Sequence, residues 1–305
     1  MNGRMKVMIA YDGSGYADAA IDDLRRAGLP PQGEILVVTA ADLYKTVIPA
    51  SSEIRALKKL VSERLLAKTV IYTRKETARM KKEARELAMQ GINRLRLRLP
   101  EWKINGKAVV GEPADELLGA ADDWKPDLIV VGSQGRSAIG RFFLGSVSKK
   151  VAEGANCPVR VARRRFGKDD DTPTKIIIGA SSLPDAERVI RAVGRRVWSD
   201  DTEARLVAVD DGVSAGRVSA VYPYAAAIFE QAADELRAAG LKISVDIKSG
   251  NLKSVLLEEA ENWEADSIFV VAGGANEESS LNETAMSLIT DALCTIEIAR
   301  RVCRS

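Results

Sequence analysis

The segment LIVVGSQGRSAIGRFFLGS, residues 128–146, decides the class of fold of this chain. Its first four residues, 128–131, are an uninterrupted apolar run, which is typical of a parallel β-strand covered by helices on both faces. A glycine-rich stretch follows directly, and residues 147–153 continue as a helix. A strand that runs through a glycine-rich loop into a helix is one step of a β-α repeat, so the segment predicts an α/β domain.

The same order of elements occurs twice along the 305 residues of the chain. KVMIAYD at 6–12 matches KIIIGAS at 175–181 with an offset of 169, and an apolar-periodic helix follows each. The strand at 128–131 has a counterpart at 267–270, now with an offset of 139. The first half therefore carries about 30 extra residues in its middle. An internal repeat of this length predicts two related domains rather than one large one.

We place the first domain at residues 1–165 and the second at 174–305. The sequence between them contains KDDD at 168–171 and Pro173, a composition typical of a solvated linker. Alternating strands and helices predict a doubly wound parallel sheet in each domain, with right-handed crossovers and helices on both faces. Ligands of such sheets bind beyond the carboxyl ends of the strands, so the loops that follow the strands are where a site is expected.

The composition excludes several classes of function. A net charge of +2 does not by itself predict a nucleic-acid or membrane partner. The absence of histidine excludes Ser-His triads and His-ligated metals, and the three cysteines form no CxxC pair. No apolar run reaches the ~20 residues that cross a bilayer, and the first residues lack a signal-peptide pattern. We therefore expect a cytoplasmic protein.

The glycine-rich segment has the form Gly-x2-Gly-x9-Gly-Ser, from Gly132 to Ser146. Glycines allow backbone amides to approach a phosphate closely, and the start of the next helix adds the positive end of its dipole. The hydroxyl groups of Ser146 and Ser148 are additional hydrogen-bond donors. The pattern predicts a phosphate-binding loop after the fourth strand, and the alternative is a loop that only turns the chain.

In this segment the chain resembles the universal stress protein family, whose ATP-binding members carry Gly-x2-Gly-x9-Gly-Ser. The resemblance extends to Asp12 after the first strand and to Cys157-Pro158-Val159 at the closing strand. It covers nearly the whole chain, as two tandem family domains. It implies a Rossmann-like sheet of the adenine nucleotide hydrolase-like group in each domain, with five parallel strands in the order 3-2-1-4-5.

The resemblance implies that the first domain binds ATP. The residues expected around the phosphates and ribose are Val131, Gly132, Gln134, Gly135, Arg136, Gly145, Ser146, Val147 and Ser148. The residues expected beside the nucleoside are Ala10, Tyr11, Asp12 and Ala40.

Asp12 has two candidate roles. A carboxylate near a triphosphate is tolerable when it meets Mg²⁺ or donors of the sugar or base, so we assign Asp12 as the candidate ligand of Mg²⁺. Alternatively, Asp12-Gly13-Ser14 is a turn and a helix cap. The two roles are compatible with each other.

The second domain lacks this site in its sequence. Asn282-Glu283 replaces Gly145-Ser146, and Ser181 replaces Asp12. The acidic residues that surround the equivalent loop are Glu277, Glu278 and Glu283. The electrostatic repulsion between one carboxylate and a phosphate oxygen at ~4 Å costs about 4 kcal/mol at an effective dielectric of about 20. This cost exceeds the gain from several hydrogen bonds of about 1 kcal/mol each. We therefore expect no ATP in the second domain.

A structural role is the alternative use of the second domain. By the resemblance to paired family domains, it is expected to form an intramolecular pseudo-dimer with the first, through the closing strands at 159–162 and 296–299. A homodimer of whole chains is left open by the sequence.

Residues 55–98 form a basic insert, with 14 Lys or Arg against four Glu. Apolar residues recur in it at helical spacing: Met80, Ala84, Leu87, Ala88, Gly91, Ile92, Leu95 and Leu99. The main interpretation is a long helix that packs on the sheet or on the partner domain while its charges face solvent. The alternative is a surface for an acidic partner, a membrane or nucleic acid.

The leading hypothesis for function is an ATP-binding protein of stress response or regulation. Without histidine, any hydrolysis is expected to be slow. One alternative is an adenylating or ATP-hydrolysing enzyme of the same fold group, although such enzymes usually carry Ser-Gly-Gly-x-Asp-Ser where this chain has Tyr11-Asp12-Gly13-Ser14. The other alternative is a nucleotide-free interaction scaffold.

Overall fold

A computed structural model describes residues 4–42, 74–135, 144–164, 172–210, 222–273 and 281–300 of the chain. In the first half, the elements follow one another in the order expected of a β-α repeat. They are β1 (Met5–Ala10), α1 (Gly15–Asp23), the short 3-10 helix η1 (Leu24–Arg26), β2 (Gly33–Asp42), α4 (Arg74–Arg98), β3 (Lys103–Gly111), α5 (Pro113–Trp124), β4 (Leu128–Gly132), α6 (Ser146–Gly154) and β5 (Val159–Ala162).

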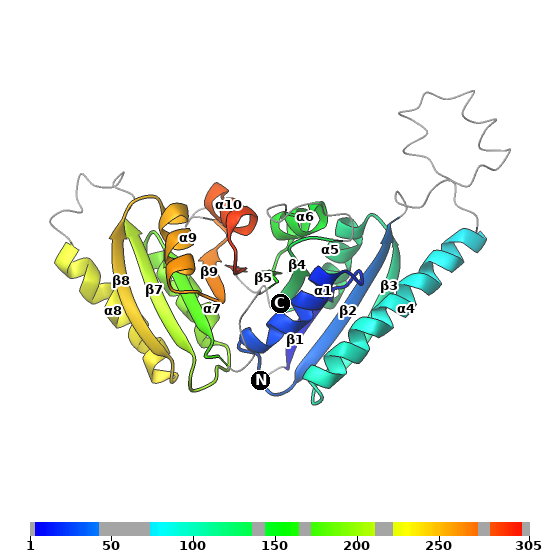
Figure 1. Cartoon of the computed structure of the whole chain (residues 1–305), viewed down its shortest axis with the longest axis horizontal. Helices are drawn as coiled ribbons and strands as arrows, with labels where there is room; N and C mark the ends of the chain where they lie inside the picture. Colours follow the sequence, from blue (N-terminus) through cyan, green and yellow to red (C-terminus); the bar gives the residue numbers. More distant parts are fainter. Residues whose placement is uncertain are drawn as a thin grey trace, which may run out of the picture.

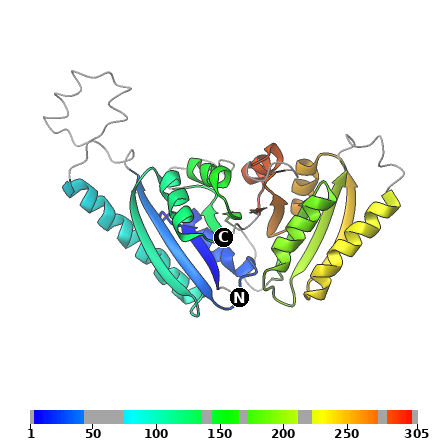
Figure 2. The same ribbon diagram turned by 180° about the vertical axis from the view of Figure 1, so that it is seen from behind.

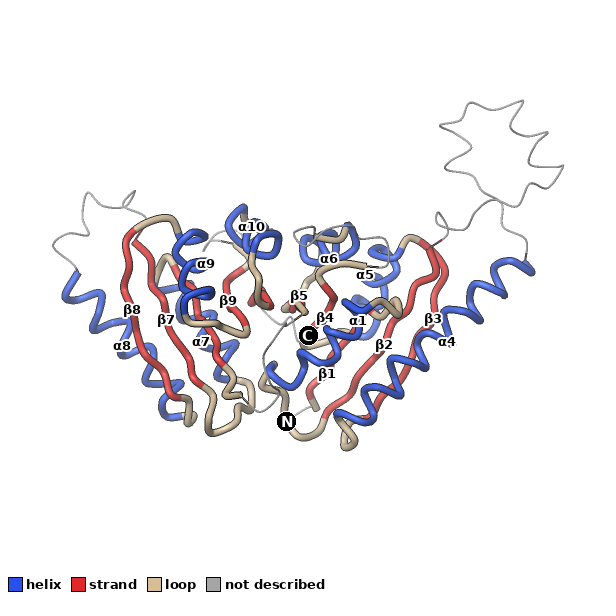
Figure 3. The backbone as a smooth tube through the Cα atoms, in the orientation of Figure 1, coloured by secondary structure: helices blue, strands red, loops and turns tan. Residues whose placement is uncertain are grey.

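The second half repeats this order. Its elements are β6 (Lys175–Ala180), α7 (Leu183–Gly194), β7 (Glu203–Asp210), α8 (Tyr222–Ala238), β8 (Lys242–Ser249), α9 (Leu252–Asn262), β9 (Ser267–Val271), α10 (Glu283–Asp291) and β10 (Thr295–Ala299). Figure 3 shows helices and strands alternating along both halves.

The strands form one ten-stranded sheet in the order β3-β2-β1-β4-β5-β10-β9-β6-β7-β8. Within each half all neighbouring strands are parallel, and the order is 3-2-1-4-5. The predicted fold class and strand order are therefore confirmed. Figures 1 and 2 show helices on both faces of the sheet in each half, with β3 and β8 at its outer edges.

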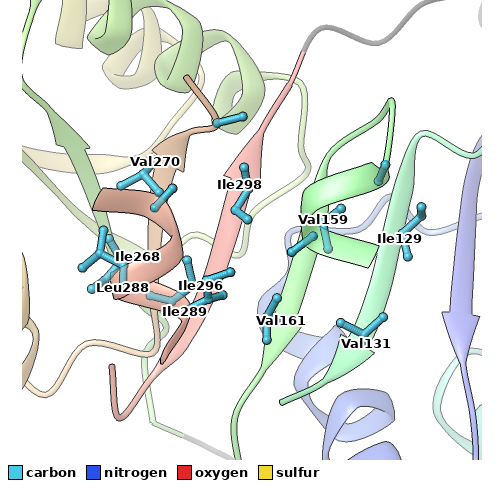
Figure 4. Packing of buried hydrophobic residues seen from close by; sticks show 14 of the residues in the cluster. Ile129, Val131, Val159, Val161, Ile268, Val270, Leu288, Ile289, Ile296 and Ile298 are labelled. Carbon is cyan, nitrogen blue, oxygen red and sulfur yellow. The ribbon is translucent and has the colours of Figure 1, made fainter. Parts of the chain in front are cut away.

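The two halves meet at β5 and β10, which pair antiparallel. The expectation that the closing strands meet is thus confirmed, with the refinement that the two five-stranded sheets are continuous. Val161 lies opposite Ile296, Arg160 opposite Glu297, and Val159 opposite Ile298. Figure 4 shows the apolar side chains of both strands on either side of this junction.

A single apolar core crosses the junction on one face of the sheet. It includes Val151 and Ala152 of α6 together with Leu288 and Ile289 of α10, all buried. Two smaller cores lie within one half each, under α1 and α4 in the first and under α7 and α8 in the second. The two halves therefore bury apolar surface against each other and are not held together by the linker alone.

Charged side chains are also buried at the junction. Arg160 is fully buried and donates to Asp23 Oδ2 at 2.5 Å and to Glu297 Oε2 at 3.0 Å. Arg196 donates to the other oxygen of Glu297, and Thr295 Oγ1 donates to Asp23 Oδ1 at 2.8 Å. Because each carboxylate has more than one donor, the desolvation of these charges is offset by satisfied hydrogen bonds.

Helix α4 is the described part of the basic insert, and residues 43–73 lie outside the described residues. The predicted apolar face is buried at Met80, Ala84, Ala88, Ile92 and Leu95, and the helix packs on β2 and β3. The prediction of a long helix on the sheet with outward charges is therefore confirmed for residues 74–98. No described helix is long and apolar enough to span a membrane.

Candidate functional site

A cavity of about 550 Å³ opens at the carboxyl ends of β1, β2 and β4 in the first half. This is the size range of small-molecule sites and the place where parallel α/β sheets bind ligands. The predicted site residues that line it are Ala10, Tyr11, Asp12, Ala40, Val131, Gly132, Gln134, Gly135, Gly145, Ser146, Val147 and Ser148. Arg136 lies outside the described residues. That the lining residues bind a nucleotide stays a prediction at this point.

The structure adds a wall to the cavity that the sequence did not indicate. Met80, Glu83, Ala84 and Leu87 of α4 line one side, and Leu117 of α5 lines another. Helical spacing marks an apolar face, but it does not distinguish residues that cover a sheet from residues that border a cavity beyond the strand ends. The β2 end also contributes more residues than Ala40 alone, namely Val38, Thr39, Ala41 and Asp42.

The ends of β1 and β2 are tied together beside the cavity. Tyr11 N donates to Val38 O at 3.0 Å, and Thr39 Oγ1 donates to Tyr11 O at 2.8 Å. The next residue, Asp12, accepts a hydrogen bond from Ser14 N at 3.0 Å, and Ser14 caps α1 through Ala17 N. The turn-and-cap role of Asp12-Gly13-Ser14 is therefore present, and it holds the Asp12 carboxylate at the cavity.

Tyr11 is buried between β1 and α4, with its ring against Gly91, where an added Cβ would lie 3.0 Å from the ring. Its hydroxyl donates to Asp18 Oδ1 at 2.8 Å. Burial, and after it the hydrogen bond to Asp18, raises the pKa of Tyr11 to about 12. The phenol is therefore neutral at physiological pH and serves as a fixed part of the site.

The glycine-rich loop brings β4, α1 and α6 close together. A Cβ on Gly132 would lie 2.7 Å from Tyr16 O, so only glycine allows α1 to begin this close to β4. Gly145 N donates to Ser133 O at 2.8 Å, and Ser148 Oγ donates to Gly132 O at 2.6 Å. Ser148 thus uses its hydroxyl proton within the protein, so the expected hydroxyl donation to a ligand rests on Ser146.

The first turn of α6 is open to the cavity. Its N-cap residue is Gly145, and no side chain in the described part of the chain caps it. The first amides of a helix have no partner within the helix, and they carry the positive end of its dipole. Because Gly145, Ser146, Val147 and Ser148 line the cavity, these amides form an anion-binding end of the kind that glycine-rich loops supply.

The charges around the cavity bear on metal binding. Its described lining contains the carboxylates of Asp12, Asp42 and Glu83 and no Lys or Arg. Among the described residues no group of three or more His, Cys, Asp or Glu side chains could hold a metal by itself. A single carboxylate does fit Mg²⁺ that is held mostly by phosphate oxygens and water, because Mg²⁺ commonly keeps several water ligands. Asp12 is therefore compatible with a shared cation site.

The arrangement of strands, loop and helix matches known proteins. A sequence profile described as the Universal stress protein family matches residues 3–163, which is more than half of the chain. The chain belongs to the universal stress protein family.

Relatives of this family member match up to about half of its length. A universal stress protein from Thermus aquaticus is 32% identical over 157 residues, which are 52% of this chain and 97% of that protein. Universal stress protein MJ0531 from Methanocaldococcus jannaschii is 34% identical over 82 residues, 26% of this chain and 48% of its own length. The chain thus spans about half the length of the second relative and nearly all of the first.

A solved structure matches both halves. The crystal structure of a universal stress protein from Archaeoglobus fulgidus DSM 4304 aligns with a TM-score of 0.63 at 18% identity, and it covers 98% of this chain and 97% of that one. At this identity the likeness shows the fold, which extends over both halves of the chain.

In the second half of the chain, called the second unit below, the equivalent loop differs in two ways. The N-cap of α10 is Asn282, whose side chain accepts from Ala285 N at 2.7 Å. Asn282 N donates to Ala272 O, as Gly145 N does to Ser133 O, so the frame of the loop is kept. The second difference is at Gly179, the counterpart of Ala10, where an added Cβ would lie 2.5 Å from Leu256 Cδ1. Leu256, the counterpart of Leu117, therefore occupies the space that the Ala10 methyl group takes in the first half.

The acidic residues of the second loop are only partly described. Glu283 is the first residue of α10 and lies beside the capped turn. Glu277 and Glu278 lie outside the described residues. The side-chain cap on α10 is thus a difference between the two halves that the charge argument alone did not contain.

Proposed function

We propose that this universal stress protein binds ATP in its first half and acts in stress response or regulation through the bound state. The observation that carries the proposal is the uncapped first turn of α6 at the edge of a cavity of about 550 Å³. Helix ends of this kind bind phosphate through backbone amides, and the cavity beside it has room for the nucleoside.

The parts of the site have separate roles in this proposal. The amides of Gly135 and of the α6 start hold the phosphates, with the Ser146 hydroxyl as an additional donor. Tyr11, Asp12 and Ala40 border the nucleoside. Met80 and Leu87 of α4 and Leu117 of α5 supply the apolar walls against which a flat base packs.

Binding is expected to depend on Mg²⁺. A triphosphate carries about four negative charges, and the described lining adds three carboxylates. A divalent cation beside Asp12 would reduce this repulsion, because hard cations bridge carboxylate and phosphate oxygens. The cation would supply charge compensation only, so omitting it should weaken binding rather than stop a reaction.

The second half, residues 174–305, is proposed to be a degenerate unit that carries no nucleotide and forms a pseudo-dimer with residues 1–165. The Asn282 cap supports this division. We expect a cytoplasmic protein in which the exposed Lys75, Lys81 and Arg85 of α4 are available to an acidic partner. Measurement of the mass in solution would decide whether whole chains also pair.

Binding, rather than turnover, is the proposed activity. The chain has no histidine to act as a general base near neutral pH. An adenylating or ATP-hydrolysing enzyme of the same fold group would show nucleotide consumption in a phosphate- or pyrophosphate-release assay, whereas a nucleotide-free scaffold would show no binding at all.

The proposal is tested by transplanting the second loop's chemistry into the first. The double variant Gly145→Asn with Ser146→Glu reproduces Asn282-Glu283. We expect calorimetry with Mg-ATP to give one site per chain in the wild type and a loss of about 100-fold or more in affinity in the variant, because a carboxylate near the phosphates costs about 4 kcal/mol before screening.

The matched control is the reverse change, Asn282→Gly with Glu283→Ser. It should leave the single site unchanged and create no second one, because Glu277 and Glu278 remain in the second loop and Ser181 still replaces Asp12. Two equal sites in the wild type, or unchanged affinity in the Gly145→Asn, Ser146→Glu variant, would overturn the assignment.

A further inference from the structure

The two halves exchange arginines across their junction. Arg163 follows β5 and donates from Nη2 to Ile289 O at 2.7 Å and to Thr290 O at 2.8 Å, at the end of α10. Arg300 follows β10 and donates from Nη2 to Ala152 O at 2.6 Å, near the end of α6. Arg163 and Arg300 occupy equivalent positions in the two halves, and so do Ala152 and Ile289. Each half therefore binds the last helix of the other.

The two helices held by these contacts differ in how they begin. Helix α10 begins at Asn282, whose own side chain caps the first turn. Ala152 is six residues after Ser146, so about 9 Å along α6 separates the Arg300 contact from the open first turn at the cavity. A helix this short moves as one piece, and a shift at its last carbonyls reaches the amides of its first turn.

Several contacts hold the carboxyl end of helix α6. The last four carbonyls of a helix have no partner within it, and Arg300 satisfies the one at Ala152. Val151 and Ala152 are also buried in the core that crosses the junction, and an added Cβ on Gly154 would lie 2.8 Å from Leu118 Cδ1 of α5. A guanidinium at the carboxyl end of a helix also interacts favourably with the negative end of the dipole. Burial lowers the pKa of Arg300.

We propose that Arg300 is a positioning residue for the nucleotide site, through which the second half holds α6 in the place where its first amides meet the phosphates. This inference rests on the proposed function. It gives the degenerate unit a role in the activity of the first unit, because the donor comes from the end of β10, more than 150 residues after the glycine-rich loop.

The twin arginine provides the control. Arg300→Gln and Arg163→Gln change arginines at equivalent positions, but Arg163 is more buried and donates two hydrogen bonds across the junction where Arg300 donates one, so Arg163→Gln should lower thermal stability at least as much as Arg300→Gln. Calorimetry with Mg-ATP is expected to show about a tenfold loss of affinity for Arg300→Gln and a change of less than twofold for Arg163→Gln. Arg300→Lys should recover part of the loss, because it restores a cation and a donor.

A second readout does not require nucleotide. Hydrogen exchange of the α6 backbone amides in the free protein should be faster in Arg300→Gln than in the wild type and unchanged in Arg163→Gln. Exchange of the α10 amides should be faster in Arg163→Gln and unchanged in Arg300→Gln. Equal affinity losses in the two glutamine variants, or unchanged exchange of α6 in Arg300→Gln, would overturn the positioning role.

The two proposals fail in different ways. If the wild type bound no Mg-ATP, the proposed function would fail, and the exchange measurement would still decide whether Arg300 holds α6. If the wild type bound one Mg-ATP and the Arg300→Gln variant bound it equally well, only the positioning role would fail.

Discussion

The two halves of this universal stress protein share one backbone plan and differ in how the last helix of each begins. In the first half the N-cap of α6 is Gly145 and its first amides face a cavity. In the second half the N-cap of α10 is Asn282, which supplies its own hydrogen bond. A frame of parallel strands can therefore keep its geometry while one residue decides whether the helix at its edge is capped by a side chain.

A second difference lies at the junction. Arg160 and Glu297 are equivalent residues of β5 and β10, and they lie directly opposite each other. If two copies of β5 paired with each other in this register, Arg160 would face Arg160 without a carboxylate between them, a costly arrangement for buried charges. The charge difference therefore favours pairing of β5 with β10 over pairing of β5 with a second copy of β5.

The largest expected effect is at this charge pair. Arg160→Met should leave Asp23 and Glu297 buried with fewer donors and lower the free energy of unfolding by about 3–5 kcal/mol, in one cooperative transition. Urea denaturation measures the change. Lys149→Met, which breaks the exposed pair with Glu153 at 4.0 Å, should cost less than about 1 kcal/mol. Similar costs for the two variants would mean that the junction does not depend on the buried charges.

A smaller effect is expected at Gly179, beside Leu256, in the second unit. Gly179→Ala gives the second half the residue that Ala10 provides in the first, but its Cβ would meet Leu256 Cδ1 at 2.5 Å. We expect a loss of about 1–3 kcal/mol from overpacking. Gly119→Ala, where an added Cβ meets nothing within 4 Å, should be neutral or stabilising.

The same variant can be examined in a Leu256→Ala background. If Leu256 is the side chain that an added Cβ would meet, Gly179→Ala should cost much less in this background, and the two changes should be strongly non-additive in thermal denaturation. Additive costs would show that the destabilisation by Gly179→Ala comes from another contact.

The smallest effect concerns the cap. Asn282→Ala should lower stability by about 1 kcal/mol, because the side chain that accepts from Ala285 N is lost. Asn282→Gly, which copies Gly145, should cost only a few tenths of a kcal/mol. Thermal denaturation of both variants gives the comparison. A glycine variant as unstable as the alanine variant would imply that an open helix start is not tolerated in this frame without its ligand.

The sequence predicted the fold and much of the site because both depend on local patterns. The apolar runs at 128–131 and 267–270 are buried strands, and the residues quoted from the ends of β1 and β4 line one cavity. The α4 wall was missed, since Met80 and Leu87 have the same spacing as their neighbours that cover the sheet. The Ser148 hydroxyl was assigned to a ligand, yet it donates to Gly132 O, an acceptor that spacing does not show.

By itself, the sequence determined which residues form strands and helices, that the chain repeats, and which half keeps the glycine-rich loop. These properties follow from periodicity and from the conformational freedom of glycine, which act over a few residues. Only the tertiary structure decided that Leu256 packs beside Gly179 and that Arg300 reaches Ala152. Such contacts join residues that are far apart along the chain, and they are set by how packed elements meet rather than by any local preference.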